Sequence, residues 1–260
     1  MQYLTSPLYL PARDYRFLFD MFGPSLGLWR AAEVAALREA LQPGEETVLD
    51  LGCGDGLVTS RVLNRVMIGL DPDGVALQKA AALQIYERQI PLPMEDAGVA
   101  ENSLDAVISN SVLEHVTRID VVLLNIARVL KPGGRLVFTC PTEAFSRWLA
   151  MPGKSYAARR NGHFEHRNLW TVTEWQRRLD HAGLRIECVR PYLRRGWVRA
   201  WDAVELMQMI YVGKTRLAGR AWRSLPAAWM DAIARRATRI DLSAPEPGGG
   251  RLIVARKGAQ

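Results

Sequence analysis

The chain has 260 residues, of which 48% are hydrophobic and 23% charged, as in an ordinary globular protein, and its formal net charge is +7. Three cysteines, an odd number, argue against a disulfide framework, and the sequence shows neither a signal peptide nor an apolar run long enough to cross a membrane. These features exclude a disulfide-rich secreted domain and a membrane-spanning protein, and we therefore expect a cytoplasmic location.

Hydrophobic periodicity predicts helices and strands that alternate along most of the chain. Residues 1–44 are expected to form a helical cap, and its clearest part is an amphipathic helix over 28–41 that stops at Pro43-Gly44. The predicted strands are 47–51, 66–70, a short edge-like strand within 87–95, 104–109, 135–140, 184–189 and 251–256. The predicted helices are 57–64, 74–86, 119–130 and 170–182. This alternation implies a parallel sheet covered on both faces, with ligands bound beyond the carboxyl ends of its strands.

The run Val48–Gly56 (VLDLGCGDG) predicts a buried strand that breaks into a glycine loop with an acid on each side of the bend, Asp50 and Asp55. Glycines allow a sharp turn and let a ligand approach the backbone closely. Two carboxylates would repel phosphates, so the loop favours a nucleoside that carries positive charge. S-adenosylmethionine, with its sulfonium and ammonium groups, is such a ligand.

This loop shares one feature with dinucleotide sites, the acid after the second strand, and differs from them in its glycine spacing. Asp71 follows the second strand, where an acid can accept hydrogen bonds from both ribose hydroxyls. The third glycine of Gly52-x-Gly54-x-Gly56 comes one position too early for the dinucleotide fingerprint. A simple tight turn between strand and helix is the plain alternative, but spacing, position and Asp71 together favour the cofactor site.

Four segments resemble the motifs of class I S-adenosylmethionine-dependent methyltransferases. They are Val48–Gly56, Gly69–Pro72 (GLDP), Leu104–Val116 (LDAVISNSVLEHV) and Ala127–Pro141 (ARVLKPGGRLVFTCP). The resemblance implies an α/β fold with a doubly wound, seven-stranded, mostly parallel Rossmann-like sheet whose last strand is antiparallel. It also implies S-adenosylmethionine as cofactor and S-adenosylhomocysteine as product.

The same resemblance assigns residues to the cofactor. The glycines of the loop would face the methionine part, Asp50 the ammonium group and Asp71 the ribose, while the pair Asp96-Ala97 would lie near the adenine amino group. The strand end Asn110–Val112 would lie near the methyl donor. The full set is Asp50, Gly52, Cys53, Gly54, Gly56, Asp71, Pro72, Asp96, Ala97, Asn110, Ser111 and Val112.

Histidines are the candidates for a catalytic base. His115 follows Glu114 just after a strand end, and His163 and His166 are expected in a loop over the acceptor site. A hydrogen-bonded structural loop is the alternative for both of the later histidines. These residues could also hold a metal, but Ser111 occupies the position at which metal-dependent relatives carry the first glutamate of Glu-x-x-Glu-His. We therefore predict no metal site.

Residues 190–240 carry the excess positive charge. They hold eleven basic and three acidic residues, together with four of the eight tryptophans. A helical lid with arginines on its wet face is one interpretation, and a lid that also contacts an anionic membrane from its inner face is a second. Nucleic-acid binding is a third, which the sequence disfavours because it holds no separate RNA-binding module and no Asn-Pro-Pro-Tyr-type motif.

These observations predict three parts. Residues 1–44 form the helical cap, residues 45–189 and 248–260 form the Rossmann-like domain, and residues 190–247 form a basic helical insertion that acts as a lid. The function predicted is methyl transfer to an acceptor, with oxygen as the leading choice of atom and a small molecule or a lipid- or carrier-linked compound as the acceptor. Transfer to nitrogen or carbon, and a cofactor-binding protein without catalysis, are the alternatives.

Overall fold

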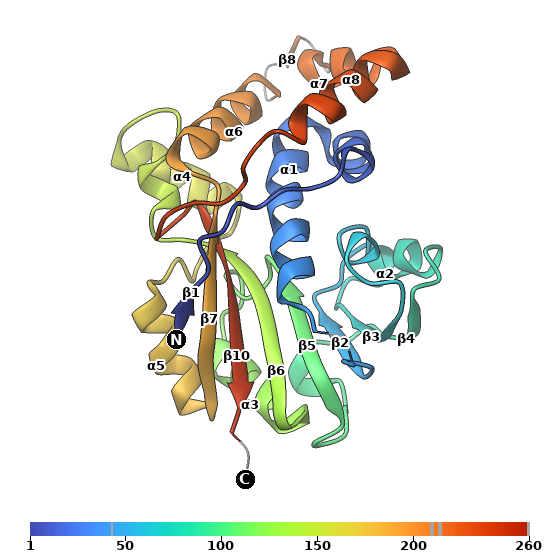
Figure 1. Ribbon diagram of the computed structural model, residues 1–260, viewed down its shortest axis with the longest axis vertical. Coiled ribbons are helices and arrows are strands. Elements are labelled where there is room, and N and C mark those ends of the chain that lie inside the picture. Colours follow the sequence, from blue (N-terminus) through green and yellow to red (C-terminus); the bar gives the residue numbers. More distant parts are fainter. Residues whose placement is uncertain (43, 209–210, 213–214, 259–260) are drawn as a thin grey trace.

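The structure of the protein, a computed structural model, describes residues 1–42, 44–208, 211–212 and 215–258. An eight-stranded sheet forms the centre of this part of the chain (Figure 1). Its strands lie in the order β1 (Gln2–Tyr3), β7 (Leu184–Tyr192), β10 (Gly250–Lys257), β6 (Leu130–Pro141), β5 (Leu104–Asn110), β2 (Val48–Leu51), β3 (Val66–Leu70) and β4 (Tyr86–Ile90).

Only β10 runs against its neighbours in this sheet. It pairs antiparallel with β6 and β7, and the other pairs between neighbouring strands are parallel. The predicted mostly parallel sheet with an antiparallel last strand is confirmed. The two-residue strand β1 adds an eighth strand that the sequence analysis did not predict.

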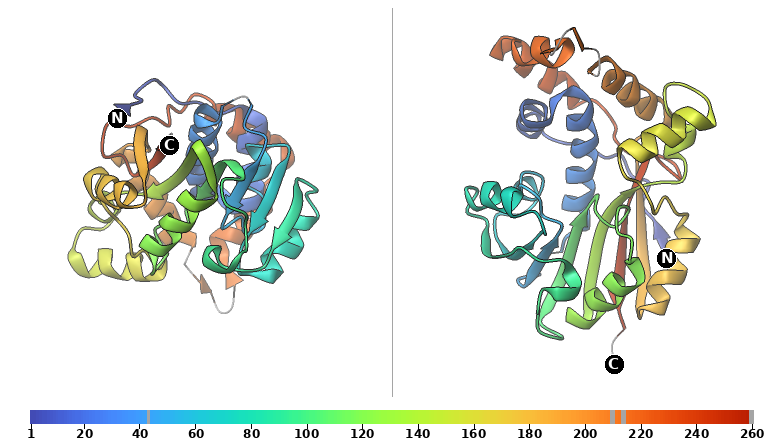
Figure 2. Two further views of the ribbon diagram at one scale, coloured as in Figure 1. Left: turned by 90° about the horizontal axis from the view of Figure 1, so that it is seen from below. Right: turned by 180° about the vertical axis from the view of Figure 1, so that it is seen from behind.

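Helices cover both faces of the sheet (Figure 2). Successive residues of a strand point to opposite faces, and in β2 both directions are buried. Val48 belongs to the apolar core that includes α1 (Ala12–Ala40), whereas Leu49 belongs to the core that includes α3 (Ile119–Val129) and α5 (Val172–His181). The fold is therefore doubly wound, as predicted.

Helix α1 connects the sheet to the basic insertion. It bends at Gly23, whose φ of 77° is not helical, and the next residue, Pro24, has no N–H to donate. Asp14, near its start, is buried and pairs with Arg38 near its end and with Arg61, at 2.7 Å in each case. One carboxylate thus holds both arms of the bent helix against the segment that follows the glycine loop.

The basic insertion forms α6 (Arg195–Gln208), the short hairpin β8 (Tyr211–Val212) and β9 (Thr215–Arg216), α7 (Leu217–Arg223) and α8 (Ala227–Ala237). These helices contact α1 beyond the carboxyl ends of the parallel strands (Figure 1). The remaining helices are α2 (Gly74–Ala81) and α4 (Lys154–His163). Pro43 and Lys214, which the sequence analysis includes in the end of a helix and in the basic segment, lie outside the described residues. Among the described helices, none has the length and apolar character required to cross a membrane.

Two predicted helices are wrong in extent. The segment 57–64 forms only a short 3₁₀ turn, Thr59–Arg61, and the Thr59 hydroxyl is held by the Asp50 carboxylate at 2.6 Å. The predicted helix 74–86 ends at Ala81 because Gln84, with a φ of 55°, turns the chain into the edge strand β4. The predicted edge strand is present as β4, which begins one residue before the predicted range of 87–95 and ends five residues before the end of that range.

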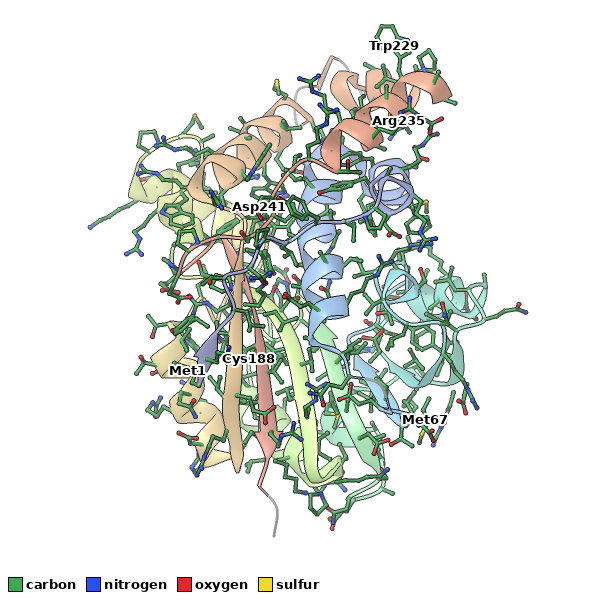
Figure 3. The ribbon with its side chains drawn as sticks, in the orientation of Figure 1. Met1, Met67, Cys188, Trp229, Arg235 and Asp241 are labelled. Carbon is green, nitrogen blue, oxygen red and sulfur yellow. The ribbon has the colours of Figure 1, made fainter. Side chains whose placement is uncertain are left out.

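The predicted apolar stripe of the last helix also needs correction. The spacing of Trp229, Ile233, Ala237 and Ile240 predicts an apolar stripe on this helix, but the side chain of Trp229 is 61% exposed. The buried residues of α8 are Met230, Ala234 and Ala237. Ala237 belongs to the predicted stripe, whereas Met230 and Ala234 each lie one position after a predicted residue. Figure 3 shows Trp229 projecting from α8 at the end of the molecule farthest from the sheet.

Candidate active site

The glycine loop turns at the carboxyl end of β2 and is fastened to β3. Gly52, Gly54 and Gly56 all have positive φ, at 71°, 54° and 73°. The N–H groups of Gly52 and Cys53 donate to the Leu70 carbonyl at 2.7 and 3.1 Å. At Gly52 the requirement for glycine is twofold, because a Cβ there would also overlap the side chain of Val112. The loop backbone is therefore pressed against the ends of β3 and β5.

The two acids of this region have different surroundings. Asp50 is 1% exposed and accepts hydrogen bonds from the Thr59 hydroxyl at 2.6 Å and the Tyr86 hydroxyl at 2.7 Å. Burial raises the pKa of its carboxyl to about 6, although these two hydrogen bonds act in the opposite direction. Asp71 is half-buried, and accepts from the Gly54 N–H at 2.9 Å. Asp50 thus supports the turn from inside the protein, while Asp71 holds it from the strand end where a ribose was predicted.

A cavity of about 290 Å³ lies beside the glycine loop at the ends of β2, β3 and β5. We call it the cofactor cavity, because predicted cofactor-binding residues line it. It is lined by Leu51, Gly52, Leu70, Pro72, Pro93, Met94, Glu95, Val112, Val116, Thr117, Arg118 and Val122. Its mainly apolar walls and open glycine backbone fit the flat base of a nucleoside. Three of the residues predicted to bind cofactor line it, namely Gly52, Pro72 and Val112.

The predicted adenine-binding pair does not line this cavity. Asp96 is exposed and Ala97 is buried, whereas Glu95, one residue earlier, lines the cavity. The short 3₁₀ turn Met94–Asp96 causes this shift, because it turns Glu95 toward the cavity and Asp96 toward solvent. Glu95 is therefore the acid at this wall, and the sequence analysis missed it.

The end of β5 is connected to α1 by a buried carboxylate. Glu33 is fully buried and accepts hydrogen bonds from the Ser111 hydroxyl at 2.5 Å and the Asn110 side-chain amide at 3.2 Å. It also accepts from the Trp29 indole at 2.9 Å and pairs with Arg30 at 2.6 Å. The sequence analysis missed Glu33, although a glutamate inside the apolar run of helix 28–41 was a visible signal.

A second cavity, of about 240 Å³, adjoins the end of β5. We call it the aromatic cavity. Its apolar walls come from Leu26, Trp29, Pro141, Phe145, Phe164 and Trp201, and its polar lining comes from Arg30, Ser111, Glu114, His115 and His166. Trp201 belongs to α6, so the basic insertion closes one side of this cavity. The centre of the Trp201 ring lies 5.2 Å from that of Trp29 and 5.5 Å from that of Phe145. The prediction that residues 190–247 act as a lid depends on Trp201.

The three candidate histidines are placed differently. His115 and His166 line the aromatic cavity, with their ring centres 5.6 Å apart, whereas His163 is exposed at the end of α4. Burial and the neighbouring His115 lower the pKa of His166 to about 4, so this ring is neutral near pH 7. The Nδ1 atom of His115 lies 3.2 Å from the Glu165 carbonyl oxygen. A hydrogen bond to that carbonyl leaves the other ring nitrogen, Nε2, free to accept a proton.

Glu114 adds a buried acid to this group. Its side chain is 1% exposed, and burial raises the pKa of its carboxyl to about 8. Its Oε1 atom lies 3.7 Å from His115 Nε2, and Oε2 has no hydrogen-bond partner among the described residues. The Nδ1 atom of His166 is likewise buried without a partner in this part of the chain. Two polar atoms without partners at one cavity suit a ligand that carries hydroxyl or amine groups.

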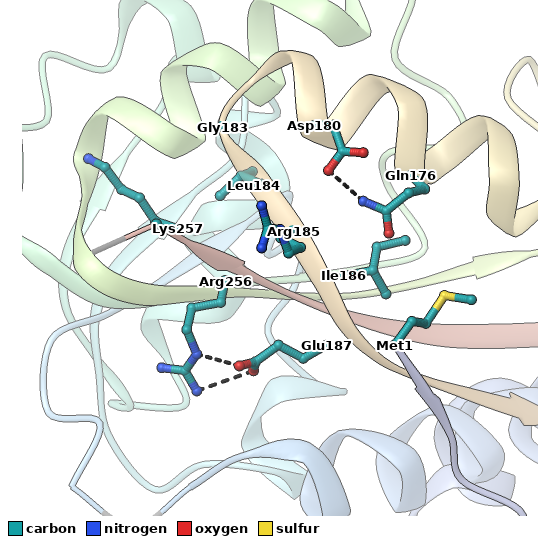
Figure 4. Close-up of a pocket in the computed structure, with 11 residues that line it drawn as sticks. Met1, Gln176, Asp180, Gly183, Leu184, Arg185, Ile186, Glu187, Arg256 and Lys257 are labelled. Carbon is teal, nitrogen blue, oxygen red and sulfur yellow. Dashed lines mark hydrogen bonds and ion pairs between the residues drawn. The ribbon is translucent and has the colours of Figure 1, made fainter. Parts of the chain in front are cut away.

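Within the described ranges, no group of three or more histidine, cysteine or acidic residues is arranged to hold a metal ion. A different hollow, of about 1,020 Å³, lies at the opposite end of the sheet, where β7 begins and β10 ends (Figure 4). It is lined by charged residues such as Asp180, Arg185 and Glu187. Because it is remote from the carboxyl ends of the parallel strands, it does not belong to the candidate active site.

Comparison with known proteins agrees with this geometry. Residues 27–189 match the family model described as a methyltransferase domain. An uncharacterised methyltransferase of Schizosaccharomyces pombe is 28% identical over 176 residues, which are 60% of this chain and 67% of that protein. The ubiquinone biosynthesis O-methyltransferase of Xanthomonas axonopodis is 30% identical over 170 residues, covering 60% of this chain and 70% of that protein.

A solved structure has the same fold over nearly the whole chain. The S-adenosylmethionine-dependent methyltransferase of Thermotoga maritima, described as a possible histamine N-methyltransferase, aligns with a TM-score of 0.59 at 15% identity. The alignment covers 94% of this chain and 99% of that one. The family match spans the glycine loop, Asp71 and the ends of β2, β3 and β5, where the two cavities lie. The chain therefore belongs to the class I S-adenosylmethionine-dependent methyltransferases.

Proposed function

We propose that the protein transfers the methyl group to an oxygen atom of an acceptor bound in the aromatic cavity. The observation that carries this proposal is the position of two consecutive residues at the end of β5. Val112 lines the cavity beside the glycine loop, and Ser111 lines the aromatic cavity. A cofactor in the first cavity and an acceptor in the second would therefore meet at this strand end.

The cofactor supplies an activated methyl group on its positively charged sulfur. What remains for this chain is to align an acceptor atom with that group and to exclude water, and such alignment can supply roughly 7–11 kcal/mol of the barrier. The aromatic walls formed by Trp29, Phe145 and Trp201 provide a rigid, largely dry surface for this purpose. An apolar or aromatic acceptor suits these walls.

An oxygen acceptor must also lose its proton. We assign that proton to the Nε2 atom of His115, because its Nδ1 atom is directed to the Glu165 carbonyl. With its proton held by His115, the acceptor oxygen would be free to bond to the methyl carbon that the cofactor would supply, and the electron pair of the carbon–sulfur bond would stay with the sulfur. A general base of this kind contributes about 10²–10⁴-fold to the rate. The neutral His166 ring and the Glu114 carboxyl are positioned to orient the acceptor.

The choice of oxygen has support from one relative. The Xanthomonas protein, 30% identical over 170 residues, is named as an O-methyltransferase of ubiquinone biosynthesis. That name supports oxygen as the acceptor atom, and the aromatic walls of the cavity here suit an apolar acceptor. We therefore propose a small-molecule or lipid- or carrier-linked acceptor.

We also propose that the outer face of the insertion contacts an anionic membrane. Trp229 is 61% exposed and Met207 is 51% exposed, and Arg235 is exposed on the same helix as Trp229 (Figure 3). Exposed tryptophan combined with arginine is typical of segments that lie at a membrane surface. Flotation with anionic liposomes at low salt tests this proposal. Loss of flotation in Trp229→Ala would support it, and absence of flotation of the parent protein would contradict it.

The methyl-transfer proposal is tested with labelled S-adenosylmethionine and a cell extract, followed by identification of the labelled product. We expect a product methylated on oxygen, and His115→Asn is expected to lower the rate by about 10²-fold or more while cofactor affinity stays unchanged. His163→Asn is the matched control, because His163 is exposed and does not line the cavity. A product methylated on nitrogen or carbon, or an unchanged rate in His115→Asn, would contradict the assignment.

A further inference from the structure

A groove between α1, the start of α6 and α8 is separate from the candidate active site. Its volume is about 670 Å³, and it shares no lining residue with the cofactor cavity or the aromatic cavity. Phe19, Leu28 and Ala237 form its floor, and each is at most 8% exposed. Trp197 and Ile233, both partly exposed, stand among its walls. The groove is thus an open, largely apolar surface between three helices.

The rim of this groove is positively charged. Arg194, Arg236, Arg239 and Asp241 line it. Asp241 already pairs with Arg194 at 2.9 Å, and its other carboxylate oxygen accepts from the backbone N–H groups of Leu8 and Ser243. Arg236 and Arg239 are exposed, and neither forms an ion pair with another described residue. Two guanidinium groups therefore stand uncompensated beside an apolar floor.

We propose that this groove binds one long-chain anionic amphiphile, with its hydrocarbon tail between the three helices and its carboxylate at Arg236 and Arg239. Burial of a hydrocarbon tail is favourable in proportion to its apolar area. Guanidinium groups match the two oxygens of a carboxylate in geometry and in charge. The volume falls within the roughly 300–1,000 Å³ that small-molecule sites occupy. Charge, apolar lining and volume together thus favour a fatty-acid type of ligand.

The chain provides a matched pair of reporters for this site. Trp197 and Trp201 lie four positions apart on α6, so they are neighbours on one helix. Trp197 lines the groove, whereas Trp201 lines the aromatic cavity of the candidate active site. A ligand that quenches tryptophan fluorescence therefore reports which of the two sites it occupies.

The experiment is a fluorescence titration of the full chain with bromine-labelled octadecanoic acid, below its micelle concentration and without vesicles. We expect saturable quenching in the parent protein. Most of this quenching should be lost in Trp197→Phe, and most of it should be retained in Trp201→Phe. Quenching that is retained in Trp197→Phe and reduced in Trp201→Phe would mean that the acid occupies the aromatic cavity, which Trp29 also lines, and would overturn the proposal. Absence of saturable quenching would overturn it as well, even if the protein floats with anionic liposomes.

The charge requirement is tested with two double variants that each remove two arginines from the insertion. Arg236→Gln/Arg239→Gln is expected to weaken binding of the acid by at least about tenfold. Arg195→Gln/Arg199→Gln is the control, because these arginines are exposed on α6 and do not line the groove. Equal weakening by both double variants would indicate a diffuse charge effect and contradict the site. The uncharged alcohol of the same chain length should bind the parent weakly and be indifferent to both double variants.

Discussion

The hydroxyl group of Ser111, at the end of β5, donates a 2.5 Å hydrogen bond to the carboxylate of Glu33, 78 positions earlier in the chain. This bond joins α1 to the strand end at which both cavities meet. The same carboxylate accepts from Trp29 and pairs with Arg30, two residues that line the aromatic cavity. One buried glutamate therefore aligns the cap helix, the strand end and the acceptor wall.

Replacing Glu33 should accordingly affect both stability and catalysis. Glu33→Ala leaves the partners of this carboxylate unsatisfied, and we expect the free energy of unfolding to fall by about 2–4 kcal/mol. Urea denaturation measures this change. Glu46→Ala is the control, because Glu46 is exposed and its removal should change stability by less than about 0.5 kcal/mol. Equal stability of the two variants would contradict the structural role of Glu33.

Gly52 should tolerate substitution less well than another glycine of similar backbone conformation. Gly52 and Gly133 have φ values of 71° and 77°, but only at Gly52 would a Cβ overlap a neighbouring side chain, that of Val112. Gly133→Ala should therefore lose about 1 kcal/mol through backbone strain alone, and Gly52→Ala at least about 2 kcal/mol.

Thermal or urea unfolding of both variants measures the difference. Val112→Ala in the background of Gly52→Ala should recover part of the loss, because the smaller side chain removes the overlap but not the strain. Equal destabilisation by the two glycine substitutions would show that the close approach of Val112 has no energetic weight.

Asp71 should control cofactor affinity. Loss of its carboxylate removes a charged acceptor at the expected ribose position and releases the Gly54 N–H, so Asp71→Ala should weaken S-adenosylmethionine binding by about 10–100-fold. Calorimetry measures this affinity. Asp73→Ala provides the comparison, since Asp73 caps α2 by accepting from Val75 and Ala76. It should lower stability by about 1 kcal/mol and leave affinity unchanged. Parent-like affinity in Asp71→Ala would refute the ribose assignment.

Stability should fall as the pH rises through the range in which Glu114 titrates. Burial raises the pKa of this carboxyl to about 8, from a usual value of 4.5. Between these two pH values the folded state therefore binds a proton that the unfolded state has released, so the free energy of unfolding decreases with rising pH. Glu114→Gln keeps a neutral group and should remove this part of the dependence, which is on the order of a few kcal/mol.

Urea denaturation of the parent and of Glu114→Gln at pH 5 and pH 8 provides the comparison. We expect the parent to lose more stability than the variant over this interval. The difference between the two proteins isolates Glu114 from other groups that titrate nearby, such as Asp50, whose pKa is raised to about 6. Parallel pH dependences would show that Glu114 is not held neutral by the fold.

The glycine loop and the succession of strands along the chain could be predicted because their signals are local. The spacing of Gly52, Gly54 and Gly56, the position of Asp71 after its strand and the apolar strands are all visible in short windows of sequence. The surroundings of Asp50 are not local, because its partner Tyr86 lies 36 positions later on the edge strand. Tyr86 makes this contact from β4, although the sequence predicts it at the end of the helix 74–86.

The aromatic cavity is the part that sequence reasoning could not assemble. Its walls bring together Trp29 from the cap, Phe145 after β6 and Trp201 from the insertion, and no sequence window contains more than one of them. His115 and His166 were candidates for chemistry, yet their stacking and the low pKa of His166 arise only from burial in the fold. Glu95 replaced Asp96 at the cofactor cavity because of the direction of a single 3₁₀ turn.

The most direct test of the central claim is an experimental structure of the protein with S-adenosylhomocysteine. We expect the ligand to lie along Gly52–Gly56, with its ribose hydroxyls at Asp71, its base in the cavity between Met94 and Val112, and its sulfur near Ser111. Binding of the ligand elsewhere, or a glycine loop that closes over this cavity and leaves it inaccessible, would contradict the account.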